Sequence, residues 1–169
     1  MKVICSKRRG SPVRLRTGSL RRLTERAAEL ANTGLRPEET LCVHFVGAAE
    51  IERVNKEFVG HEGMTDVICF DYRGGESPLD EDDVAAEILI CPEAAQRQNE
   101  TRGRQFHREL ALYLIHGLLH LAGEDDLDPA SRRRMRRKER AALEHLEKEF
   151  DFEKIFRSAD CTEADHSLQ

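Results

Sequence analysis

The segment from Leu110 to Ala122 constrains the fold more than any other part of the chain. Every residue in it is apolar, aromatic or glycine, except for His116 and His120. A helix that is apolar around its whole circumference must be buried, so the other elements are expected to pack around this one. The two histidines are four residues apart, and this spacing places them on one face of the helix. Two buried imidazoles without partners would be costly, and a shared metal ion removes that cost.

The residues that follow this helix predict a third metal ligand. A catalytic zinc takes three protein ligands and keeps a fourth position for water. Gly123 lets the chain turn back, and Asp126 lies where the returning chain can supply a ligand. The histidines, the glycine and the aspartate have the spacing of the long zinc-protease motif, but Gly117 replaces the glutamate that serves there as general base. The segment therefore predicts one zinc on His116, His120 and Asp126, in another kind of metal hydrolase or as a structural metal.

A plainer interpretation of the histidine pair stays open. Histidines four residues apart also occur as ordinary surface or core residues, and short motif matches carry a real false-positive risk. The apolar surroundings, the glycine turn and a carboxylate at the right offset together favour a metal site at the end of a buried helix.

Alternating strand and helix patterns along the chain predict an α+β fold with a single domain. Strands are expected at residues 2–6, 40–46, 66–72 and 84–90. The short polar connection between the last two, residues 73–83, suggests an antiparallel hairpin. Helices are expected around Leu20 to Leu30, between Ser19 as N-cap and Gly34 as stop, around Ile51 to Phe58, from Pro92, from Arg104 to Leu121, and from Asp128 and Pro129. The expected architecture is a small mixed four-stranded sheet packed with about five helices.

Length and composition set the outer limits of the prediction. The 169 residues are expected to form one domain over residues 1–157, followed by a flexible C-terminal tail over residues 158–169. No apolar run approaches the ~20 residues of a membrane span, so no membrane partner is expected. The first residues lack the apolar core of a signal peptide, and the five cysteines form no CxxC pair. A cytoplasmic location with reduced thiols is therefore expected.

Charge is distributed unevenly along the chain. The net charge of −5 argues mildly against nucleic acid as a partner, but residues 132–140 contain seven Arg or Lys against one acid, and residues 7–26 contain eight against one. Residues 50–100 contain fourteen acids against four bases. Local basic patches on an acidic protein can bind phosphate, although such charge runs are usually solvated helix faces. Arg133 and Arg137 are the candidate phosphate-binding residues.

Three blocks of the sequence carry a resemblance to a known family. "HGLLHLAGEDD", residues 116–126, resembles the H-G-x-L-H-L-x-G-x-D-H signature of the YbeY-type rRNA maturation endoribonucleases. "VNKEFVGHEGMTDVICFDY", residues 54–72, is similar to their N-x-x-Y/F … T-D-V-L-S-F segment, and "AAEILICPEAA", residues 85–95, to their G-D-I-V-I-S segment. The order and spacing agree over roughly residues 1–150.

This resemblance implies a zinc-dependent endoribonuclease. The expected substrate is single-stranded ribosomal RNA, and the expected process is maturation of small-subunit ribosomal RNA and ribosome quality control. The small ribosomal subunit or its assembly proteins are the expected partners. Arg133 and Arg137 would then contact the RNA backbone.

Departures from the family pattern bear on the catalytic groups. Asp126 stands where most members have a third histidine, and Val59 stands where most have an arginine. A subset of the family resembles this chain at both positions and has a histidine two positions further on, here His61. The general base is unknown, and the candidates are Glu109, Asp125 and His61.

Two other function classes remain open. One is a ribosome-assembly factor with a structural metal and little or no nuclease activity, for which Val59 and the carboxylate ligand leave room. The other is a metallopeptidase-like hydrolase, against which Gly117 counts.

Overall fold

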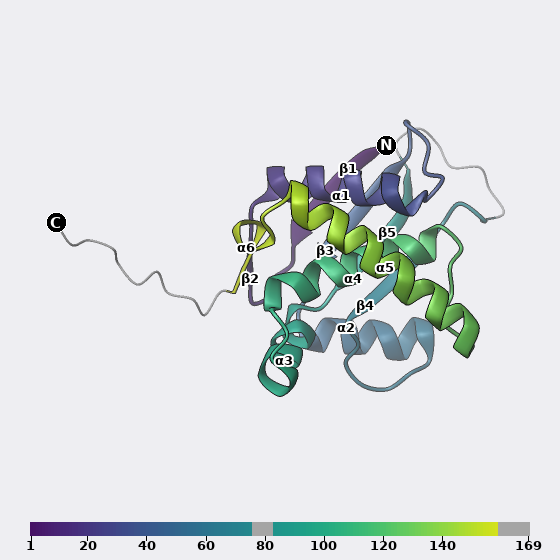
Figure 1. The fold of residues 1–169 in the computed structure, drawn as a ribbon. Helices are drawn as coiled ribbons and strands as arrows, with labels where there is room; N and C mark the ends of the chain where they lie inside the picture. The colour runs from purple at the N-terminus through teal and green to yellow at the C-terminus, as the bar shows by residue number, and fades with distance from the viewer. Residues whose placement is uncertain (76–82, 159–169) are drawn as a thin grey trace.

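A four-stranded mixed sheet forms the centre of the molecule (Figure 1). The computed structural model describes residues 1–75 and 83–158. The strand order is β1 (Lys2–Lys7), β3 (Thr40–Phe45), β5 (Val84–Ile90) and β4 (Val67–Asp71). The first three strands are parallel, and β4 runs antiparallel to β5, with Val67 opposite Ile90 and Asp71 opposite Ala86. The predicted mixed sheet and its hairpin are confirmed.

Helices and a short second sheet complete the fold. The helices are α1 (Thr17–Ala31), α2 (Ala48–Val54), the π-helical turn η1 (Asn55–Val59), α3 (Pro92–Arg102), α4 (Phe106–Leu121), α5 (Pro129–Glu149) and α6 (Phe152–Ile155). Strands β2 (Val13–Leu15) and β6 (Phe156–Ser158) pair antiparallel in a two-stranded sheet that the sequence patterns did not predict, because three-residue strands carry too little alternation. Ser158, the first residue of the predicted tail, thus ends a strand, and residues 159–169 lie outside the described part of the chain.

Two local predictions need correction. Helix α1 begins at Thr17 with Arg16 as N-cap, so Ser19 lies inside the helix, and the helix ends where Asn32 adopts a left-handed conformation with φ of 56°, before Gly34. Asparagine is one of the few residues that tolerate this conformation. Phe58 does not share the buried face of Ile51 and Val54: it is 63% exposed. It lies in the π-helical turn, whose wider spacing takes it out of the 3.6-residue register.

Helix α4 is the core element that the sequence predicts. Ten of its residues are buried, and it contacts β4 and β5 on one side and α5 on the other, with α5 crossing in front of it in Figure 1. Gly117 is the point of closest approach to the sheet. A Cβ atom there would lie 2.9 Å from Ile88 Cγ2 and 3.4 Å from Val67 Cγ2. A glutamate at this position would therefore meet the sheet rather than a metal site.

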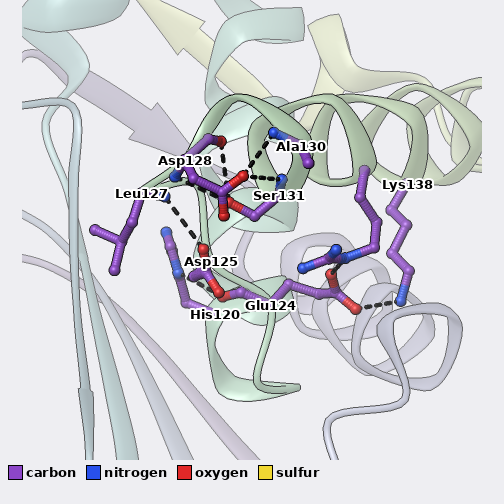
Figure 2. Close-up of polar contacts among 9 residues, drawn as sticks. His120, Glu124, Asp125, Leu127, Asp128, Ala130, Ser131 and Lys138 are labelled. Atoms are coloured by element: carbon purple, nitrogen blue, oxygen red, sulfur yellow. Dashed lines mark hydrogen bonds and ion pairs between the residues drawn. The ribbon is translucent and has the colours of Figure 1, made fainter.

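Asp128 and Pro129 begin α5 as the sequence predicts. The Asp128 carboxylate accepts hydrogen bonds from Ala130 N at 2.7 Å and Ser131 N at 3.1 Å, and the Ser131 hydroxyl accepts one from Asp128 N (Figure 2). This capping box satisfies backbone donors that a helix start leaves unpaired. The backbone hydrogen bonds from Ser131 and Ala130 lower the pKa of Asp128. Within the described residues, no helix combines the length and the apolar character needed to cross a membrane.

Gly117→Ala should lower the free energy of unfolding by about 1 kcal/mol. Overpacking against Ile88 costs about 1–3 kcal/mol. The better helix propensity of alanine returns up to about 1 kcal/mol. Urea denaturation of both variants checks this, with Gly18→Ala in α1 as the control, because a Cβ at Gly18 meets nothing within 4 Å. If both substitutions raise the free energy of unfolding equally, the side chains of Ile88 and Val67 must move aside for the added methyl group at Gly117.

Candidate metal centre

The last two turns of α4 bring His116 and His120 together. Their Nε2 atoms lie 2.9 Å apart, and the ring centroids are 4.5 Å apart with the ring planes at 85°. Both side chains are half-buried. The predicted convergence of the two imidazoles is therefore present, and the two Nε2 atoms are the ones that converge.

The other nitrogen of each imidazole has an acceptor of its own. His116 Nδ1 lies 2.6 Å from Glu139 Oε1, and His120 Nδ1 lies 2.9 Å from the backbone oxygen of Glu124. An ionised carboxylate and a carbonyl oxygen can only accept, so both Nδ1 atoms carry a hydrogen. In the neutral imidazoles, both Nε2 lone pairs then point at each other. A proton or a metal ion between them removes this repulsion, and histidine ligands of metals almost always have such Nδ1 partners.

Electrostatics make the two histidines unequal. Burial alone would lower the pKa of His116, but the hydrogen bond and charge of Glu139 outweigh it and hold that pKa above its ordinary value. Burial, followed by the charge of His116, lowers the pKa of His120. When His116 is protonated, its Nε2 donates to Nε2 of His120, which accounts for the 2.9 Å separation.

Asp126 lies beside the pair on the loop after α4. Its negative charge adds to the effects of Glu139 that raise the pKa of His116 and partly offsets the lowering of the pKa of His120 by burial, and it lines the same cavity as His116. Its backbone oxygen accepts hydrogen bonds from Arg132 at 3.1 and 3.3 Å. No group of three His, Cys, Asp or Glu side chains in residues 1–75 and 83–158 is arranged to hold a metal ion. The donor types and the two converging lone pairs fit zinc, while Asp126 as third ligand stays a prediction.

The loop that carries Asp126 is anchored to α5 (Figure 2). Gly123 supplies the turn, with φ of 83°, and its N–H donates to the His120 carbonyl. The Glu124 carboxylate accepts from Arg134 at 2.8 Å and Lys138 at 2.5 Å, and these two cations lower its pKa. Asp125 is engaged within the loop, where its carboxylate accepts from Leu127 N at 3.2 Å.

A cavity of about 260 Å³ adjoins His116. Charged side chains of both signs line it, with the carboxylates of Asp66, Glu109, Asp126 and Glu139 and the guanidinium groups of Arg104, Arg132 and Arg136. Glu109 is buried and ion-paired with Arg104 at 3.1 Å. Cations and acids thus share the wall of this cavity.

The predicted catalytic candidates separate in space. Glu109 lines the cavity beside His116, whereas His61 and Val59 line a second hollow, which adjoins His120. Asp125 lines neither. Glu109 and His61 therefore line different hollows, one that adjoins His116 and one that adjoins His120.

Several residues at the site that the sequence patterns did not single out lie on α5. Arg133 and Arg137 are exposed and are not among the residues that line the cavity, whereas Arg132 and Arg136 are. Glu139 does not stand out in the sequence, because it is the single acid among the seven Arg or Lys of residues 132–140. Its helical register could have revealed it, because it lies four residues after Met135 and four before Leu143, and both of these are buried.

Comparisons with known proteins decide the family. The family model described as Endoribonuclease YbeY matches residues 7–147. The chain belongs to the YbeY endoribonuclease family. Endoribonuclease YbeY of Macrococcus caseolyticus is 38% identical over 105 residues, 60% of this chain and 68% of the relative. Endoribonuclease YbeY of Desulforamulus reducens is 36% identical over 120 residues, 69% of this chain and 78% of the relative.

A solved structure agrees with the family assignment. The solution structure of TM1509 from Thermotoga maritima superposes with a TM-score of 0.57 at 29% identity, covering 88% of this chain and 91% of that one. The expected YbeY-type α+β fold is therefore confirmed, and the predicted enzyme class agrees with the names of the YbeY relatives.

Zinc binding should depend on both histidines and on the register of the loop. We expect about one zinc per chain, lost largely in His116→Ala and His120→Ala, because each removes one of three protein ligands. Asp126→Ala should weaken zinc binding more than Asp125→Ala, which leaves the proposed ligand set intact. His107→Ala, elsewhere on α4, is the control. Zinc titration of the purified variants checks this order, and release by Asp125→Ala with retention by Asp126→Ala would refute the assigned register.

Proposed function

We propose that this YbeY-family chain is a zinc-dependent endoribonuclease that cleaves single-stranded RNA during maturation of small-subunit ribosomal RNA. One observation carries the proposal: the Nε2 atoms of His116 and His120 converge, with both Nδ1 hydrogens engaged, at a cavity that arginines line. The names of the YbeY relatives supply the reaction class. A cytoplasmic site of action, a role in ribosome quality control, and contact with the small subunit or its assembly proteins belong to the same proposal.

His116, His120 and Asp126 are the residues that would hold the zinc. When bound, the ion supplies Lewis acidity toward a phosphate oxygen and favours ionisation of a water molecule. The chain itself supplies the setting for this chemistry. Glu139 and Glu124 keep the Nδ1 hydrogens in place, and the carboxylate of Asp126 adds negative charge on the side of the cavity.

The arginines of the cavity are suited to bind the RNA backbone. Arg132 and Arg136 belong to the same wall as His116 and Asp126, so a phosphate held by them would lie beside the metal ligands. The ion pair between Arg104 and Glu109 leaves Arg104 less available for this role. Single-stranded RNA is the favoured substrate because its backbone and bases are accessible, whereas an A-form duplex hides its major-groove edges.

Proton transfer requires a group other than Gly117. We assign it to Glu109, since Glu109 alone of the three candidates lines the cavity beside His116, where its carboxylate is 3.1 Å from Arg104. His61, in the hollow that adjoins His120, is the alternative. The RNA 2′-hydroxyl would then attack the adjacent phosphorus as its proton passes to the base, and the bond from phosphorus to the 5′-oxygen of the next nucleotide would break, leaving a 2′,3′-cyclic phosphate and a 5′-hydroxyl that takes its proton from solvent.

The purified, zinc-loaded protein should cleave labelled single-stranded RNA and leave casein intact. Glu109→Gln should lower the cleavage rate about 10²–10⁴-fold with zinc content unchanged, which is the usual contribution of a general base. His61→Ala is the matched comparison. Cleavage of casein would favour a peptidase, and zinc binding without cleavage of any RNA would favour an assembly factor with a structural metal.

Charge reversal on α5 should affect RNA binding more for the inner pair, Arg132 and Arg136, which lines the cavity, than for the outer pair, Arg133 and Arg137, which does not. Reversing Arg132 and Arg136 should weaken RNA binding and reduce the steepness of log K against log salt by roughly 1.4, because two phosphate contacts to a single strand are lost. Reversing Arg133 and Arg137 should have a smaller effect, since neither lines the cavity. Binding titrations across a salt series test both pairs. A larger effect of the outer pair would support the prediction made for Arg133 and Arg137 from sequence.

A further inference from the structure

Glu139 stands out among the residues of α5 by what it contacts. It is the single acid in residues 132–140, which contain seven Arg or Lys. An exposed glutamate in such a run would pair with a neighbouring cation on its own helix. The Glu139 carboxylate instead crosses to α4, where its Oε1 lies 2.6 Å from His116 Nδ1, and its side chain is only 15% exposed. The Glu139 carboxylate therefore pairs with the imidazole of His116 rather than with a cation of its own helix.

The helix pair holds this contact in place. Met135 and Leu143, one turn to either side of Glu139, are buried against the core. Farther along the same two helices, Arg108 of α4 forms an ion pair of 2.6 Å with Glu147 of α5. The carboxylate thus approaches His116 from a fixed element rather than from a mobile loop.

We propose that Glu139 is a positioning residue of the metal centre, which fixes the tautomer and the ring orientation of His116 so that its Nε2 lone pair faces His120. This inference rests on the proposed metal-dependent function. A neutral imidazole can carry its hydrogen on either nitrogen, and only the form with a free Nε2 can bind a metal there. His120 is fixed in the same way by the Glu124 carbonyl, which no side-chain substitution removes. Of the two Nδ1 acceptors, therefore, only that of Glu139 can be removed by a side-chain substitution.

The charge of Glu139 adds to its role as acceptor. A carboxylate that accepts from a ligand imidazole makes that imidazole more basic, and loss of such partners typically weakens metal binding 10–100-fold. Glutamine at this position keeps an acceptor oxygen but loses the charge. Alanine loses both. The two substitutions therefore distinguish tautomer control from charge.

The test compares Glu139→Gln and Glu139→Ala with Glu144→Ala, a control at an exposed position of α5. The first readout is the ¹⁵N NMR tautomer of His116 in metal-free protein, at a pH well above imidazole titration. We expect the Nδ1–H form in wild type, Glu139→Gln and Glu144→Ala, and a mixture of forms in Glu139→Ala. The second readout is zinc affinity, which should fall about 10–100-fold in Glu139→Ala, less in Glu139→Gln, and not in Glu144→Ala.

The two readouts keep this inference separate from the proposed function. Zinc affinity of Glu139→Ala equal to that of wild type, or an Nε2–H tautomer of His116 in wild type, would overturn the role of Glu139. Absence of zinc binding in wild type would instead overturn the proposed metal centre, while the tautomer measurement would still test the hydrogen bond. If Glu139→Ala fails to fold, Glu139→Leu takes its place with the same expected results, because leucine also lacks an acceptor but fills more of the space.

Discussion

The packing of α4 between the sheet and α5 is the constraint on which the rest of the structure depends. An almost wholly apolar helix must be covered on every side, and the close approach at Gly117 lets the sheet cover one side without a gap. Helix α5 covers another side, and its contact brings Glu139 to His116. The two histidines are the polar residues of this helix segment, and they lie where the cover is incomplete. The same packing that buries the helix therefore creates the site.

Electrostatics at the site follow from what α5 brings to it. Two of its cations, Arg134 and Lys138, are bound by Glu124 and anchor the loop that carries Asp126. Arg132 and Arg136 instead face the cavity. The acids nearest the histidines thus favour a bound cation, and the arginines at the cavity wall favour an anion. This mixture of charges is what the proposed function requires, because a metal ion and a phosphate group would then bind side by side.

The sequence predicts the elements of this fold better than the partners of its site. Hydrophobic periodicity identifies the four strands and α4, because burial imposes that periodicity. The spacing of His116 and His120 likewise predicts their convergence. The run of arginines alone does not reveal which of them face the cavity. Neighbouring residues on a helix are about 100° apart, so Arg132 and Arg133 point in different directions. The role of Glu139 depends on how α4 and α5 cross, and that contact joins residues 23 positions apart.

Two departures from the family pattern change the charge balance in the same direction. Asp126 is a carboxylate where the sequence resemblance implies a neutral histidine in most members, and Val59 is apolar where it implies an arginine. Both changes strengthen the attraction for a metal cation and weaken the attraction for an RNA phosphate. Arg132 and Arg136 line the cavity beside His116, whereas Val59 lines the hollow that adjoins His120. Under the proposed function, the positive charge that binds RNA phosphate would therefore come from the first turns of α5 rather than from η1.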